Sequence, residues 1–281
     1  MKTATTIDEQ IKLLTDRGII ISDTEKATEI LSDIGYYRLG FYLFPFETTY
    51  PNLKNRSHQY KQGTKLEYAV ALYYLDFDLR HILTRYLIRI EIALRTAIIY
   101  NISNKYKKSP TWFVDKSVVE NEYAKNFDNL VYPNIINKPV IIRHHKKYFN
   151  DKFAPAWKTI EYMTLGEVNS LYHNFKSADD KLLISRCFNV NNTTVFENYL
   201  EVLRVVRNLC AHGNVLFDLK LRKSIRKGPA GNGGHDLKAA TAVIRYLLKQ
   251  VSTNREKEMV ERINDAINDA KKNFPDIEKM L

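Results

Sequence analysis

The sequence predicts an all-α fold, and two features of the 281-residue chain support this prediction. Glycine and proline are few, at 10 and 8 residues, and both are missing from the long stretches 64–109 and 167–212. A β-rich chain would need turn residues far more often. Within the first stretch, apolar residues recur at helical spacing: Leu83, Leu87, Ile90, Leu94 and Ile98. We therefore expect one long helix, or two nearly continuous ones, over residues 64–109.

The N-terminal 60 residues predict short elements. An amphipathic helix is expected first, and a second begins at Ser22, where Glu25 completes a capping-box pattern. The aromatic segment "GYYRLGFYLFPFE" follows and is broken by Gly40 and Pro45. We expect it to form a buried turn. Residues 1–60 are thus predicted to be a helical segment that packs on the core.

Residues 61–281 are predicted to form the main helical domain. Residues of about 105–155 mix proline, asparagine, aromatic and basic residues, which indicates a long, partly irregular insertion. The glycine-rich segment "KGPAGNGGHD" precedes two C-terminal helices, expected at about 236–275. There is no βαβ pattern and no phosphate-binding loop motif.

The net charge of +11 and the pI of about 9.4 favour a polyanionic partner, most often nucleic acid. The alternative is a basic protein without such a partner. Two basic patches, 220–227 and 141–147, support the first interpretation, and "NKYKK" (104–108) is similar. Such side chains contact phosphates without reading sequence. The candidate RNA-binding residues are Lys220, Arg222, Lys223, Arg226, Lys227, Arg143, Lys146 and Lys147.

The sequence shows no signal peptide and no apolar stretch of about 18 residues, so no membrane association is expected. The two cysteines, Cys187 and Cys210, are expected to be reduced thiols of a cytoplasmic protein. No cofactor motif and no metal-ligand cluster is found, so we expect neither a cofactor nor a metal.

The stretch "RVVRNLCAHGNVLFD" (204–218) carries the main candidate site. A capping-box pattern at Thr194 predicts that its helix begins near residue 195, and Gly213 predicts the end. If Phe196 is set at zero on a helical wheel, Arg207 lies at about 20°, in the middle of the apolar stripe, while Asn208 and His212 lie at about 120° and 160°.

Two interpretations of this placement remain open. A buried guanidinium must be paired or must emerge at an interface. Arg207 could be a structural clamp, with His212 as a favourable cation at the helix C-terminus. Alternatively, the two form a site for RNA cleavage through attack of the ribose 2′-OH, in which His212 exchanges a proton and Arg207 holds the phosphate. Cys210 points about 200° away from His212, which disfavours a Cys–His dyad or metal site.

A second polar pair, Glu91 and Arg95, lies at i,i+4 spacing in "LIRIEIALRTAIIY". Glu91 lies at the edge of an apolar stripe. We expect it to orient Arg207 or Asn208 across a helix contact, and the alternative is a boundary salt bridge worth little.

"RNLCAH" resembles the R-x4-6-H motif of the HEPN superfamily, in which an Asn commonly follows the Arg. The wider chain resembles abortive-infection proteins of the AbiD/AbiF-like family. The matching segments are "GYYRLGFYLFPF", "RIEIALRTAIIY", "APAWKTIEYMTLGEVNSLY" and "LRVVRNLCAHGNVLFD", in the expected order. The chain has Val215 where the family often has an Arg.

This resemblance implies an all-α HEPN-like bundle and a metal-independent endoribonuclease toxin of a phage-defence or toxin–antitoxin system. It also implies a homodimer, in which two copies form one composite site, and a small structured antitoxin RNA as a possible partner. The catalytic roles map onto Arg207, His212 and Asn208, with Glu91 and Arg95 in support. The alternative from another class is a non-catalytic RNA-binding or protein-binding module.

Overall fold

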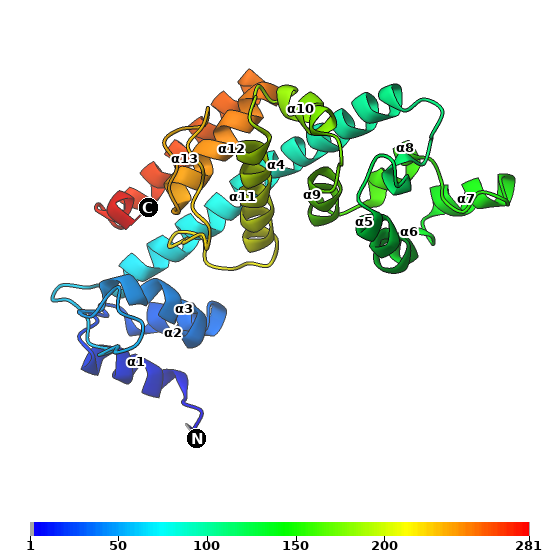
Figure 1. Ribbon diagram of the computed structural model, residues 1–281. Helices are drawn as coiled ribbons and strands as arrows, with labels where there is room; N and C mark the ends of the chain where they lie inside the picture. Colours follow the sequence, from blue (N-terminus) through cyan, green and yellow to red (C-terminus); the bar gives the residue numbers. More distant parts are fainter. Residues whose placement is uncertain (1–2, 281) are drawn as a thin grey trace. The chain divides into compact units, whose positions relative to one another are not determined.

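The computed structural model describes residues 3–280 and confirms the all-α prediction (Figure 1). Within these residues the only β-type pairings are isolated bridges. None of the helices found there is both long and apolar enough to cross a bilayer. The chain divides into two compact units, each formed from segments far apart in sequence.

Unit 1 comprises residues 1–82, 209–219 and 259–281. Its complete helices are α1 (Ile7–Asp16), α2 (Thr24–Asp33) and α3 (Tyr36–Leu43). It also contains the start of α4 (Leu66–Lys105), the end of α11 (Thr193–Ala211) and the end of α13 (Thr253–Lys271). Aromatic rings fill part of its core, where Tyr68 stacks on Phe274 with ring centroids 4.6 Å apart.

Two predictions within unit 1 were wrong. The second helix is capped by Asp23, whose side chain accepts a hydrogen bond from the Lys26 amide, whereas Ser22 donates to Glu67 instead. The segment after Gly35 is no turn, because α3 runs through Gly40 and continues into a 3-10 turn that contains Pro45. Proline is tolerated there because the first turn of a helix needs no amide donor.

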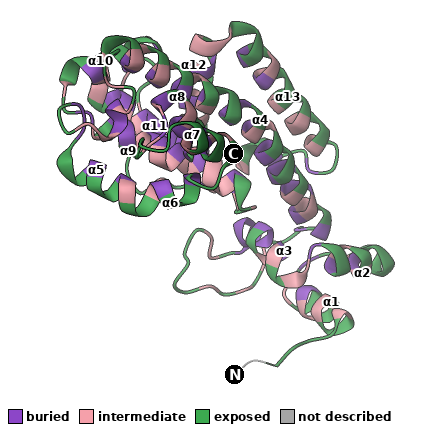
Figure 2. Cartoon of the chain, turned by 90° about the vertical axis from the view of Figure 1, so that its right-hand side faces the viewer, coloured by how far each residue is buried: buried purple, intermediate pink, exposed green. Residues whose placement is uncertain are grey.

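Unit 2 comprises residues 83–208 and 220–258. It contains most of α4, α11 and the start of α13, together with complete helices from the middle of the chain. These are α5 (Asn121–Asn126), α6 (Tyr132–Ile135), α7 (Pro139–Lys147), α8 (Ala156–Thr159), α9 (Leu165–His173), α10 (Ala178–Arg186) and α12 (Leu237–Val251). Figure 2 shows buried residues concentrated where α9 and α11 face the interior of this unit.

Within the stretch 64–109, residues 66–105 form the single long helix α4, one of the two predicted outcomes. The segment 105–155 has short helices rather than one regular element, and it carries its own aromatic cluster around Phe127. Phe113 and Phe153 lie 5.0 and 6.1 Å from that ring, between centroids. At the C-terminal end of α4, where this segment begins, the buried Asp180 of α10 accepts hydrogen bonds from Lys105 and Tyr106. Lys105 is therefore engaged in a structural ion pair.

Candidate functional site

Helix α11 carries the candidate motif. It begins at Thr193, because the Asn192 side chain accepts hydrogen bonds from the amides of Thr194 and Val195. The predicted capping box at Thr194 was therefore wrong. Glu197, its supposed partner, instead accepts a hydrogen bond from Lys181 at 2.8 Å.

Within unit 2, the structure brings Arg207 together with the second predicted pair. Arg95 is buried and donates to both Glu91 and the Met163 carbonyl, each at 3.0 Å. The other oxygen of Glu91 lies 3.9 Å from Arg207 Nε. Glu91 therefore stands between two arginines, as the stripe positions indicated. The contact with Arg207 is too long for a hydrogen bond.

Arg207 lies at the edge of the unit rather than inside it. Its side chain is 37% exposed, compared with 10% for Arg95. No Arg207 nitrogen makes a hydrogen bond within residues 3–280, so its guanidinium fork is available for a ligand such as a phosphate. Asn208 is half-buried and likewise has no side-chain hydrogen bond in this part of the chain.

His212 belongs to unit 1 and lies in the turn directly after α11. It is exposed, and its imidazole has no hydrogen bond or ion pair to any described residue. The backbone around it is fixed, because the amides of Gly213 and Asn214 donate to the carbonyls of Cys210 and Leu209. Gly213 adopts a φ of 63°, the left-handed conformation of a helix C-terminal stop. His212 is thus a free side chain on a fixed turn.

A buried carboxylate holds the chain that follows His212. Asp76 of α4 is fully buried, and one of its oxygens accepts hydrogen bonds from the amides of Leu216 and Phe217, at 3.0 and 2.7 Å. Its other oxygen is paired with Arg80 and accepts from the Tyr42 hydroxyl at 2.8 Å. Such a group is tolerated in an apolar interior only because its acceptor sites are filled.

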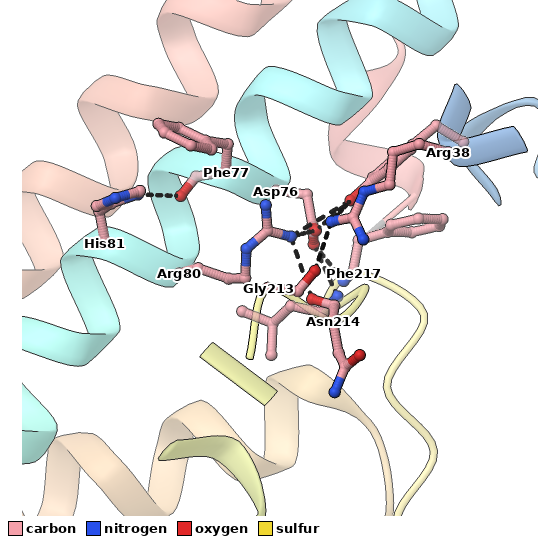
Figure 3. A network of polar contacts seen from close by, with 10 residues as sticks. Arg38, Asp76, Phe77, Arg80, His81, Gly213, Asn214 and Phe217 are labelled. Carbon is pink, nitrogen blue, oxygen red and sulfur yellow. Dashed lines mark hydrogen bonds and ion pairs between the residues drawn. The ribbon is translucent and has the colours of Figure 1, made fainter. Parts of the chain in front are cut away.

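Two arginines bind the same loop from its carbonyl side (Figure 3). Arg80 donates to the carbonyl of Asn214 at 3.1 Å, and Arg38 of α3 donates to that of Gly213 at 2.5 Å. Burial, followed by the charge of Asp76, raises the pKa of Tyr42 to about 12. Its hydroxyl therefore stays protonated and remains a hydrogen-bond donor.

The sequence patterns did not single out this network, although one signal was present. On the wheel of α4, Asp76 falls about 40° from Leu72, inside the buried stripe, as Arg207 does on α11. A charged residue in an apolar stripe indicates a specific partner, and Asp76 with Arg80 also has i,i+4 spacing. Arg38 and Tyr42 lie in the segment "GYYRLGFYLFPF", for which no site role was predicted.

The predicted RNA-binding residues are all exposed and all belong to unit 2. The basic loop 220–227 is attached to α11, since Asn198 accepts from the Arg226 amide and donates to the Ser224 carbonyl, at 2.8 and 3.2 Å. Lys223 and Arg226 line a groove of about 460 Å³ beside α9 and α11. Neither side chain forms an ion pair within the described residues, so both present unneutralised positive charge.

The acidic residues of this groove are already paired. Glu201 binds Arg204 through two hydrogen bonds, at 2.8 and 2.5 Å, and Glu197 is engaged by Lys181. The groove therefore carries net positive charge along one side of α11. Across residues 3–280, His, Cys, Asp and Glu side chains form no group of three or more suited to a metal ion.

A family model described as Abi-like protein matches residues 29–218, more than half of the chain. The chain belongs to the Abi-like protein family. The match covers α3, α4 and the whole of α11, and so includes the Asp76 network as well as Arg207 and His212. Membership of the Abi-like family points to a role in abortive infection. No curated protein and no solved structure matches the chain.

We predict that Asp76→Ala destabilises the protein by about 3–5 kcal/mol, because it leaves Arg80 buried without its carboxylate and removes the acceptor of two amides. Urea unfolding followed by circular dichroism would measure the loss. Asp78→Ala, an exposed aspartate on the same helix, is the matched control and should change stability by less than about 0.5 kcal/mol. Equal losses in the two variants would contradict the assignment.

Proposed function

We propose that this Abi-like protein is a metal-independent endoribonuclease that acts as the toxin of a phage-defence or toxin–antitoxin system. One observation carries the proposal. His212 is exposed and has no side-chain partner among the described residues, whereas the loop after it is fixed by Asp76, Arg80 and Arg38. A proton-transfer group needs this combination of a free imidazole and a rigid support.

In the proposed reaction the ribose 2′-oxygen attacks the adjacent phosphorus and the 5′-oxygen leaves, which produces a 2′,3′-cyclic phosphate. A base removes the 2′-OH proton and an acid protonates the leaving oxygen. His212 is the group suited to either role near neutral pH. Arg207 stabilises the extra negative charge on the phosphate, Asn208 supplies a hydrogen bond to it, and Glu91 and Arg95 position Arg207.

The reaction needs an acid and a base, whereas each chain supplies one histidine in this motif. A homodimer that brings two copies of the motif to one phosphate would supply both. We therefore propose a composite site in a homodimer. RNA is the proposed substrate, and a small structured RNA is a candidate antitoxin, since the exposed cations of unit 2 would bind the backbone of either.

A second candidate is a non-catalytic HEPN-like module that binds RNA or a protein. The 3.9 Å contact of Arg207 with Glu91 favours it, because a structural clamp would have this partner. The two functions differ in the effect of Arg207→Ala. A clamp predicts a melting temperature several degrees lower with RNA binding retained, whereas a catalytic Arg207 predicts lost cleavage at nearly unchanged stability.

We predict that His212→Ala lowers the RNA cleavage rate at least about 100-fold and abolishes growth arrest, because the site loses its proton-transfer group. Cleavage of total RNA would be measured in EDTA, since the proposed chemistry requires no metal. His235→Ala, at another exposed histidine, is the control and should cleave as the wild type does. Undiminished cleavage by His212→Ala would refute the proposal.

We also predict that an excess of His212→Ala subunits lowers the activity of each wild-type subunit after subunit exchange. Mixed dimers would carry a single His212 and therefore lack either the acid or the base. The cleavage rate is measured against the mixing ratio, with serum albumin replacing the variant in the control. A rate that depends only on the amount of wild-type subunit would show that each chain acts alone.

A further inference from the structure

Helix α7 of unit 2 presents a basic face to solvent. With Ile141 at zero on its wheel, Lys146, Arg143 and Lys147 fall at about 140°, 200° and 240°. All three are exposed, and none forms an ion pair within residues 3–280. Most of α7 is coloured as exposed in Figure 2. The helix therefore concentrates unneutralised positive charge on one side.

The opposite side of α7 is anchored. Ile141 and His144 are buried, and the His145 ring nitrogen lies 2.6 Å from the Tyr132 hydroxyl. His144 Nε2 lies 3.1 Å from Asp151, beyond the helix end. Burial lowers the pKa of His144, so its ring is mainly neutral at pH 7. These contacts give the exposed face a fixed orientation.

Two aromatic residues follow the basic face directly. The chain turns after α7, with the Asp151 amide donating to the Tyr148 carbonyl at 3.1 Å. The Tyr148 ring lies 5.0 Å from the His144 ring, between centroids, and Lys147 Nζ lies 5.3 Å from its centre. Phe149 at the tip of the turn is 82% exposed, and its ring has no aromatic partner among the described residues.

Helix stability accounts for only part of this arrangement. Cations in the last turn of α7 offset the partial negative charge at the helix C-terminus. That effect gives no reason for a phenylalanine ring in water, where it costs free energy without packing. Three cations without an ion pair among the described residues, followed by an exposed aromatic ring, fit a partner that is both anionic and aromatic.

We propose that this α7 surface, composed of Arg143, Lys146, Lys147, Tyr148 and Phe149, binds single-stranded RNA, with an unpaired base stacked on Phe149. The inference rests on the proposed function in one respect, namely that RNA is the ligand. The cations contact successive phosphates, and the ring stacks on a base of any identity. In a duplex the base faces are covered by their neighbours, so the same surface would bind duplex only through charge.

The test measures affinity with a fluorescent 20-nucleotide single-stranded RNA and with a duplex of the same length, in the His212→Ala background so that neither is cut. We expect Phe149→Ala to weaken single-strand binding by about 5- to 150-fold, as loss of one stacked base does, and to leave duplex binding unchanged. Phe149→Tyr, which keeps an aromatic ring at this position, should bind the single strand as tightly as Phe149 does. Lys146→Gln should reduce the slope of log affinity against log salt by about 0.7, the value for one phosphate contact on a single strand.

Tyr37→Ala is the matched control, because Tyr37 is an equally exposed aromatic residue, at 81%, in unit 1. It should not change either affinity. Equal effects of Phe149→Ala on single strand and duplex, or no effect on both, would overturn the inference. A loss of self-association in Phe149→Ala with unaltered RNA affinity would also overturn it, by assigning the surface to a protein contact. Because cleavage is not measured, these outcomes are independent of whether His212 is catalytic.

Discussion

The hydrogen bonds of one buried carboxylate determine where the candidate catalytic histidine can be. Asp76 is removed from water, so each of its lone pairs must be satisfied by the protein. Two of its donors are backbone amides just beyond α11. Another path of the chain after the helix would leave one oxygen of this buried carboxylate without its two amide donors. His212 lies between this anchored loop and the last turn of α11, and its backbone position follows from both.

Arg207 depends on a similar constraint in unit 2. Arg95 is buried because Glu91 and a backbone carbonyl accept its hydrogen bonds, and the same carboxylate then has one oxygen left facing Arg207. In each unit an ion pair with a buried arginine supports the candidate residue, while the candidate residue itself remains partly or fully exposed. A site whose supporting side chains are buried and whose candidate side chains are exposed would combine stability with access for a ligand.

Features that follow from the spacing of apolar residues were predicted from the sequence. Features that depend on contacts with residues far away in the chain were not. The unbroken apolar pattern predicted α4. The position of Glu91 in its apolar stripe predicted that it would face Arg207 or Asn208, and it lies near Arg207. Capping-box patterns gave wrong helix starts, because Asn192 rather than Thr194 caps α11. Local patterns did not reveal the role of Asp76 for a different reason, since the two amides that donate to it lie about 140 residues further along the chain. Which amides reach a carboxylate is settled by tertiary packing, and no local pattern encodes it.

Whether a basic side chain is available to a ligand depends on whether an acidic side chain of the protein already pairs with it. Lys105 belongs to a basic run, yet its charge is already paired with the buried Asp180. Lys146 and Lys223, in runs that look alike in sequence, have no acidic partner among the described residues. Composition cannot separate these cases, because it counts charges without their neighbours. Lys146 and Lys223 are both exposed and both belong to unit 2, so each keeps a positive charge at the surface of this unit that no described acidic side chain neutralises.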